Sequence, residues 1–342
     1  MGPKMRKHMK LILKLGVILL SVLSKHAFSA TVIIYHHVSE SSPKSTSVTP
    51  DQFKQHMDLI EELDLTVVPL TKIADRIRNN QHIEPNWLAI TFDDGYRNVY
   101  DEALPILKQR NWPFTVFVNP DMVKPSKLYM DWAQLKELTL HNGHIANHTL
   151  SHENLVRDDL SIQDIETNLL TSEEKIKKET GQSSRMLAYP YGEYNDEIKA
   201  LLAKHDFIGF AQHSGAINQT SDRYALTRFP ANGIYANPKT LRAKLKSLPF
   251  SFKNNAPTDT NPSSRTPEWT VFLSNKDFYQ SQLACFITGQ SKPVKPVWHD
   301  KLSFTIRSES EIGQGRVKYN CTAPSIKHMG RYYWTSKLWI SP

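Results

Sequence analysis

Two short segments of the sequence combine residue types that bind divalent metal ions and transfer protons. Asp93 and Asp94 stand side by side in TFDDGY, directly after an apolar run. Adjacent carboxylates repel each other unless a positive charge lies nearby, and a divalent cation would supply that charge. His148 and His152 are four residues apart, so their imidazoles meet on one helical face or one tight turn, which is a metal-ligand spacing. A capped turn and two structural histidines are the alternative interpretation.

The segments that position these residues alternate between strand-like and helix-like patterns. Apolar runs predict strands at 31–35, 65–69, 87–92, 114–118, 186–189 and 208–211, with helical spacing at 49–63, 70–79, 98–110, 132–140, 162–180 and 196–204. This alternation is typical of a parallel sheet or an α/β barrel. The two segments, and a third at Tyr189–Gly192, fall at strand-to-helix junctions. Active sites of α/β barrels lie on that face.

The composition changes near Pro249. Residues 251–268 are rich in Asn, Pro, Ser and Thr, so we expect a linker over 249–268. Strand-like runs without helical spacing follow and predict a small β-sandwich over 269–342. The two cysteines of the chain, Cys285 and Cys321, lie there. In an exported protein we expect them to form one disulfide, the alternative being two buried thiols.

Residues 1–30 have the layout of a secretory signal peptide. Basic residues precede the apolar run 15–23, and small residues follow it. Because the run is short for a membrane span, we expect cleavage after Ser29 or Ala30 and no stable span afterwards. An uncleaved membrane anchor is the alternative. The sequence therefore predicts an exported protein, periplasmic or extracellular.

The charge of the remaining chain argues against nucleic-acid binding. The whole chain has a net charge of +8, but six of its basic residues and none of its acidic ones lie in residues 1–30. Without them, 36 basic residues face 34 acidic ones. A nucleic-acid-binding protein should keep a basic surface after such trimming. The hydrophobic share of 39% is that of a globular protein with a buried core.

Together the segments resemble the motifs of the polysaccharide deacetylases, the NodB-homology carbohydrate esterases of family four. Thr91–Tyr96 resembles their TFDDG motif, His148–His152 their H-[S/T]-x-x-H motif, and Leu187–Gly192 their third motif, which ends in Pro-[Tyr/Phe]-Gly. The resemblance covers residues 31–248, about two thirds of the chain. Tyr35–Val38 resembles the subgroup that acts on exopolysaccharides such as poly-β-1,6-linked N-acetylglucosamine.

The resemblance implies a distorted (β/α) barrel of the NodB-homology type with one divalent metal ion, usually zinc, held by Asp94, His148 and His152. Asp93 would be the general base that takes a proton from metal-bound water. The resulting hydroxide would attack the acetamide carbonyl of an N-acetylated sugar, and a backbone N–H near Tyr191 would stabilise the oxyanion. We therefore predict a hydrolase that removes acetyl groups from an amino-sugar polysaccharide, with an exopolysaccharide of the poly-N-acetylglucosamine type as the favoured substrate.

The sequence departs from the family pattern at the general acid. The late Leu-x-His motif is not evident, and we take His213 as the candidate acid, with His36 or His37 as alternatives. His36, Tyr191 and Trp132 are the candidate substrate-binding residues. For Trp132 the alternative is a core residue that opens the helix 132–140.

A second departure concerns the arginine that normally pairs with the base carboxylate. Ala188 stands at its position, and Arg185 and Arg228 are the candidate replacements.

Peptidoglycan and chitooligosaccharides are the alternative substrates, and a non-catalytic carbohydrate-binding envelope protein is the alternative function. A pure binding protein has no need of a base beside a metal, which favours the enzyme. The sequence predicts no particular protein partner.

Overall fold

The computed structural model describes residues 29–124, 126–253 and 260–341, so residues 1–28 of the predicted signal peptide lie outside the described residues. Its first part is built on an eight-stranded sheet in which every pairing is parallel. The order is β10-β1-β5-β6-β7-β8-β9, with β4 paired to β5. The strands are β1 (Ala30–Tyr35), β4 (Thr66–Val67), β5 (Trp87–Phe92), β6 (Phe114–Val118), β7 (Gly143–Asn147), β8 (Met186–Ala188), β9 (Ile208–Phe210) and β10 (Phe229–Pro230).

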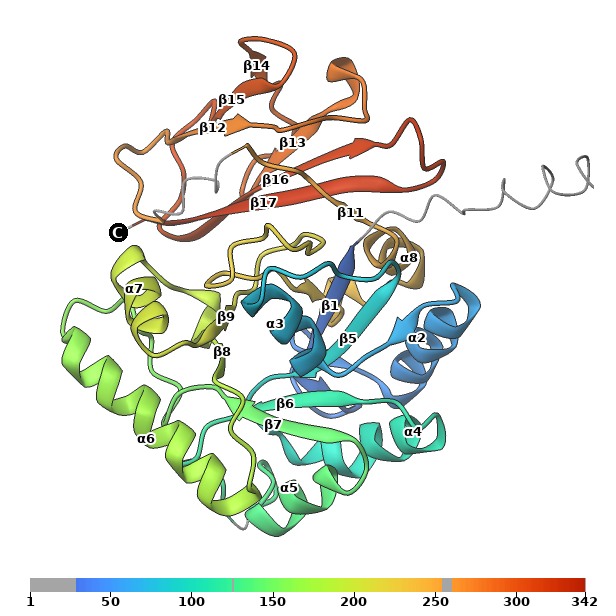
Figure 1. The fold of residues 1–342 in the computed structure, drawn as a ribbon, viewed down its shortest axis with the longest axis vertical. Helices are drawn as coiled ribbons and strands as arrows, with labels where there is room; N and C mark the ends of the chain where they lie inside the picture. Colours follow the sequence, from blue (N-terminus) through green and yellow to red (C-terminus); the bar gives the residue numbers. More distant parts are fainter. Residues whose placement is uncertain (1–28, 125, 254–259, 342) are drawn as a thin grey trace, which may run out of the picture.

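The sheet curls into an incomplete barrel with helices around it (Figure 1). The helices are α2 (Pro50–Glu62), α3 (Leu70–Arg78), α4 (Leu104–Gln109), α5 (Trp132–Thr139), α6 (Ile162–Thr180), α7 (Asp196–Lys204) and α8 (Pro238–Leu245). Capping boxes at Thr49, Asp131 and Ser161 fix where α2, α5 and α6 begin. Within the described residues, no helix is both long and apolar enough to cross a membrane.

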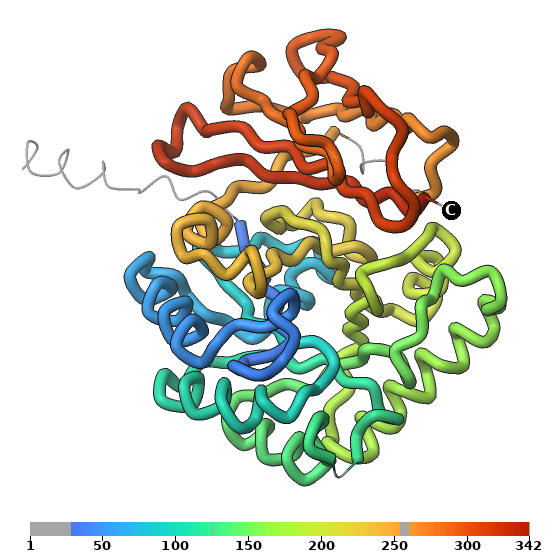
Figure 2. The backbone as a smooth tube through the Cα atoms, turned by 180° about the vertical axis from the view of Figure 1, so that it is seen from behind, coloured from blue at the N-terminus to red at the C-terminus, as the bar shows by residue number. Residues whose placement is uncertain are grey.

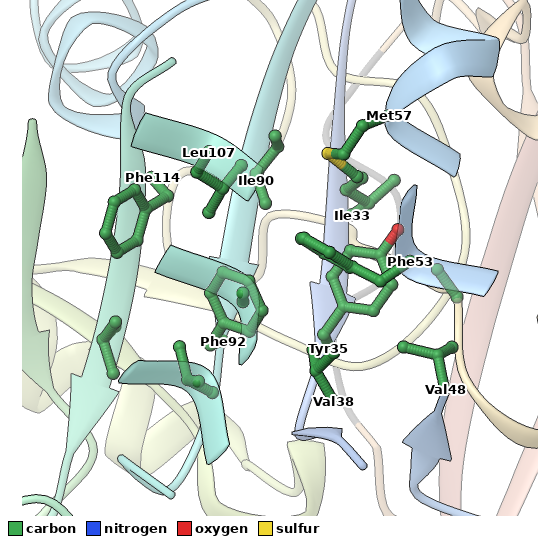
Figure 3. Packing of buried hydrophobic residues seen from close by; sticks show 14 of the residues in the cluster. Ile33, Tyr35, Val38, Val48, Phe53, Met57, Ile90, Phe92, Leu107 and Phe114 are labelled. Carbon is green, nitrogen blue, oxygen red and sulfur yellow. The ribbon is translucent and has the colours of Figure 1, made fainter. Parts of the chain in front are cut away.

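Successive side chains along the strands enter two different cores. Val32 and Ala89 belong to the core inside the barrel, which also contains apolar residues of α3. Ile33 and Ile90 belong to the core between the sheet and the outer helices, where they lie near Met57 of α2 (Figure 3). This alternation follows from the two-residue period of a strand that is buried on both faces. Each strand residue therefore points either into the barrel or toward the outer helices.

The C-terminal part consists of two further sheets. One has the order β11-β17-β16-β13 and the other β12-β15-β14. Their strands are β11 (Leu248–Pro249), β12 (Glu268–Phe272), β13 (Ala284–Ile287), β14 (Val297–Trp298), β15 (Ser303–Arg307), β16 (Gly315–Pro324) and β17 (Tyr332–Ser341). Both contribute to one apolar core, and a Cys285–Cys321 disulfide joins β13 to β16. The predicted fold class, a barrel followed by a small all-β unit, is confirmed.

The sheet that contains β16 and β17 packs against the side of the barrel, between α7 and α8 (Figures 1 and 2). Trp334 of β17 contacts the ring of Phe229 edge-on at a centroid distance of 5.2 Å. Leu338 of the same strand joins a cluster of barrel residues that includes Leu187 and Tyr189. Apolar side chains therefore cross from one part to the other, as in a shared core.

Candidate active site

Asp93 follows β5, and an arginine from another strand neutralises it. Arg228, directly before β10, donates from Nη1 to Asp93 Oδ1 at 2.7 Å and from Nη2 to Oδ2 at 2.8 Å. Both side chains are 0% exposed. Arg228 also donates from Nε to the carbonyl of Ala211 at 2.9 Å and lies over the ring of Phe117. Arg228, one of the two candidate replacements, thus pairs with Asp93, while Arg185 bonds the carbonyl of His205 instead.

The electrostatics of this pair keep Asp93 ionised. Burial favours the neutral acid, but Arg228, together with His148 and His36, outweighs burial and holds the pKa of Asp93 below its ordinary value. The fork of the guanidinium takes one lone pair of each carboxylate oxygen, so Asp93 keeps acceptor capacity for a further proton donor. A carboxylate of fixed orientation with free lone pairs is suited to accept a proton.

Asp94, His148 and His152 form a second cluster next to this pair. Each offers one ligand atom, and the three atoms lie within 4.8 Å of one another. The Nε2 atoms of both histidines are 3.2 Å from Asp94 Oδ1, yet Asp94 Oδ1 and His148 Nε2 are buried without a hydrogen bond. His148 Nδ1 donates to the carbonyl of Ala188 at 2.7 Å, so its Nε2 carries the lone pair. One carboxylate and two imidazoles that converge in this way fit a divalent metal, zinc above all, with coordination positions left open.

Four residues around this cluster have left-handed backbone conformations. Their φ angles are 71° at Asp94, 67° at Thr149, 61° at His152 and 59° at Tyr191. For residues other than glycine, this conformation costs on the order of 1–3 kcal/mol, so it persists only where the surroundings impose it. The turns bring His148 and His152 together without a helix, because residues 148–152 lie in a loop after β7.

Two buried asparagines at strand ends hold that loop. Asn119, after β6, donates to the carbonyls of His148 and, at 3.3 Å, of Thr149. Asn147, the last residue of β7, accepts from the N–H of Thr149 at 2.8 Å and donates to Glu173 at 3.2 Å. Sequence reasoning did not single out either residue. Their position directly at the end of an apolar strand was the available signal.

His36 lies beside the two carboxylates. Burial lowers its pKa, while the negative charges of Asp93 and Asp94 act in the opposite direction. Its Nδ1 is 3.5 Å from the side-chain amide of Asn232. The neighbouring His37 stacks on the ring of Tyr96 at a centroid distance of 3.6 Å, and Asp94 acts on its pKa. His36 is thus the histidine of this segment on which both Asp93 and Asp94 act.

His213 lies at the contact with the C-terminal sheets. Its Nε2 bonds the hydroxyl of Tyr194 at 3.0 Å, and its Nδ1 is 3.4 Å from the hydroxyl of Ser336 in β17. It lines a cavity of about 100 Å³ between the barrel and β17. Burial, together with lysines such as Lys318 and Lys337, lowers its pKa to about 3. The structure therefore brings His36, and not His213, next to Asp93 and Asp94.

The two aromatic candidates lie in different places. Tyr191 has its ring edge on His152 at a centroid distance of 4.7 Å and is 42% exposed. Trp132 is the first residue of α5 and packs against the core between sheet and helices. Tyr191 borders the cluster of Asp94, His148 and His152, whereas the contacts of Trp132 are those of a core residue.

Comparisons with known proteins find related sequences and a related fold. Residues 80–209 match the sequence profile described as polysaccharide deacetylase. The chain is 26% identical, over 58% of its length and 69% of the relative, to the Bacillus subtilis protein YxkH, whose name places it among the polysaccharide deacetylases. It is also 26% identical to the poly-beta-1,6-N-acetyl-D-glucosamine N-deacetylase of Staphylococcus epidermidis, over 58% of this chain and 78% of that protein.

Two solved structures share the barrel fold. The deacetylase PplD of Streptococcus pyogenes, in complex with acetate, superposes with a TM-score of 0.58 at 22% identity, covering 64% of this chain and 99% of that one. IcaB from Ammonifex degensii gives 0.57 at 23% identity, covering 64% and 98%.

Proposed function

We propose, from the membership of this chain in the polysaccharide deacetylase family, that it is a metal-dependent hydrolase that removes acetyl groups from an N-acetylated amino-sugar polysaccharide. The observation that carries the proposal is the pair of unpartnered buried atoms, Asp94 Oδ1 and His148 Nε2, which face His152 directly beside the ionised Asp93. A site that only bound sugars would gain nothing from this arrangement.

Asp94, His148 and His152 would hold the metal, which when bound lowers the pKa of a coordinated water and polarises the acyl oxygen. Asp93 then accepts the proton of the attacking water, because Arg228 keeps its carboxylate ionised and fixes its direction. The backbone N–H at Tyr191 donates to the acyl oxygen as negative charge develops there.

His36 is the proton donor that we assign to the leaving amine. Burial lowers the pKa of His36 overall, but the carboxylates of Asp93 and Asp94 favour its protonated form, and it lies beside the base. His213 is the second candidate. The positive charges that act on it are lysines, and they oppose protonation.

An exopolysaccharide of the poly-N-acetylglucosamine type is the substrate that we favour. The support is the named activity of the Staphylococcus epidermidis relative together with the segment Tyr35–Val38, which places His36 in the site. Peptidoglycan and chitooligosaccharides are the alternatives. The Cys285–Cys321 disulfide supports an exported protein, because such bonds persist in oxidising compartments.

The test is acetate release by the purified protein from partially N-acetylated poly-β-1,6-glucosamine and from chitooligosaccharides, with added zinc and with chelator. Chelator-sensitive release from the first polymer supports the proposal. If the protein prefers chitooligosaccharides, they take the place of the exopolysaccharide as the proposed substrate. Asp93→Asn should abolish release and keep the bound zinc. If the protein binds polysaccharide without releasing acetate from any of these substrates, it is a carbohydrate-binding protein.

A further inference from the structure

Two basic side chains of the C-terminal sheet contact loops of the barrel, one of which borders the candidate active site. Arg316 and Lys318 are two residues apart on β16, so they share one face of the strand. Arg316 Nη1 donates to the backbone carbonyl of Tyr191, and its Nε lies 3.2 Å from Glu193 Oε1. Lys318 Nζ donates to the carbonyl of Gln212 at 2.7 Å.

The loop that Arg316 contacts has an unusual backbone conformation. Tyr191 has φ 59° and Gly192 has φ 72°, so two consecutive residues are left-handed. Gly192 also lies so close to Gln212 that a Cβ atom would come within 2.6 Å of that side chain. Such a turn needs support from outside its own residues. Arg316 holds the carbonyl of Tyr191, and Lys318 holds Gln212, on which the turn rests.

The same contacts extend to the loop that carries His152. Glu193 Oε2 accepts from the side-chain amide of Asn154 at 2.8 Å, and Asn154 is two residues beyond His152. The ring of Tyr191 packs edge-on against the imidazole of His152. A continuous chain of bonds therefore runs from Arg316 through Glu193 to the loop that holds one of the three converging ligand atoms.

We propose that Arg316 is a positioning residue that sets the place of Tyr191, and that the C-terminal sheet is in this way an integral part of the catalytic unit. The proposal rests on the proposed function, in which Tyr191 borders the substrate and its backbone N–H meets the acyl oxygen. Displacement of a reacting group by about 1 Å costs on the order of a hundredfold in rate. Loss of Arg316 should therefore act on turnover more than on substrate affinity.

The experiment compares three variants of the full chain. Arg316→Ala removes the contacts to Tyr191 and Glu193, and Arg316→Lys restores a donor at the same place. Arg307→Ala is the matched control, because Arg307 forms an exposed pair with Glu268 at 3.4 Å within the C-terminal sheets. We expect Arg316→Ala to lower kcat of acetate release by about tenfold to a hundredfold with KM nearly unchanged. Arg316→Lys should recover part of the loss, and Arg307→Ala should match the wild type.

Hydrogen exchange measured by mass spectrometry gives a second readout that needs no activity. Arg316→Ala should increase deuterium uptake in the peptide that contains Tyr189–Tyr194 and leave the peptide that contains β6 unchanged. Wild-type kcat together with wild-type uptake in this variant would overturn the inference. If the wild type itself releases no acetate, the proposed function fails, and the exchange result alone decides the role of Arg316. Should Arg316→Ala not fold, Glu193→Gln carries the same two measurements, because it removes the charge that pairs with Arg316 and keeps a side-chain oxygen that can accept from Asn154.

Discussion

Replacing Arg228 with methionine tests the buried ion pair, because it removes the guanidinium and keeps most of the apolar stem. Arg228 makes two bonds to Asp93, at 2.7 and 2.8 Å, and one to Ala211 at 2.9 Å, and both side chains of the pair are 0% exposed. The variant leaves a buried carboxylate without its counter-charge. Breaking a buried pair in this way lowers the free energy of unfolding by about 3–5 kcal/mol. Urea unfolding at pH 7 measures the loss.

The pH dependence of that loss follows from the pKa of Asp93. In the wild type, burial raises this pKa, but Arg228, with His148 and His36, brings it below its ordinary value of 3.8. The pair therefore contributes stability above pH 3.8 that is lost as the pH falls through the lower, folded-state pKa. In Arg228→Met burial still raises the folded-state pKa of Asp93, and only the weaker influences of His148 and His36 oppose it, so this pKa rises relative to the wild type. The variant should be most destabilised at neutral pH and approach the wild type as Asp93 takes up its proton.

The same substitution should impair catalysis, because Asp93 loses its fixed direction and binds its proton more tightly. We expect kcat/KM for acetate release to fall by about 10²- to 10⁴-fold and the acidic limb of its pH profile to move to higher pH. The double variant Arg228→Met with Asp93→Asn removes both charges, and it should be less destabilised than the sum of the two single variants. An Arg228→Met protein within about 1 kcal/mol of the wild type, or strictly additive losses, would refute the reasoning.

Three further predictions concern other parts of the molecule. His148→Ala should lose stoichiometric zinc by elemental analysis, and His144→Ala, which changes a histidine outside the ligand cluster, should keep it; equal zinc in both would contradict the proposed ligand set. Burial holds the pKa of His213 at about 3, against 6.5 when unfolded, so neutral His213 contributes stability above pH 6.5 that is lost toward pH 3. Between pH 7 and 4.5, the free energy of unfolding of His213→Gln should therefore fall by about 2–3 kcal/mol less than that of the wild type. The same pH dependence of this free energy in both proteins would speak against a buried neutral imidazole. Changing Cys285 and Cys321 to serine opens a closed loop with a separation of 36 residues and should lower the free energy of unfolding by about 4 kcal/mol, whereas an unchanged urea midpoint would show that the bond constrains little.

The parts of the fold and site that could be predicted are those set by local pattern. Alternating apolar and helical spacing indicated the parallel sheet, because strands buried on both faces leave continuous apolar runs. The spacing of His148 and His152 indicated the ligand pair. The exact backbone was beyond reach, since left-handed φ angles at Thr149 and His152 depend on Asn119 and Asn147, and Asn119 comes from a neighbouring strand.

The partners of Asp93 depend on strand order, which local pattern does not reveal. β1 lies between β5 and β10, so His36, which follows β1, lies near the end of β5. Arg228 precedes β10, and its long side chain extends to Asp93 after β5. Every buried parallel strand presents the same apolar pattern and the same backbone donors, so the sequence does not say which strands are neighbours. The sequence therefore favoured His213 as the proton donor, with His36 or His37 as alternatives, whereas the strand pairing puts His36 beside the base. Because β1 pairs with both β5 and β10, segments from the two ends of the barrel sequence meet at the base.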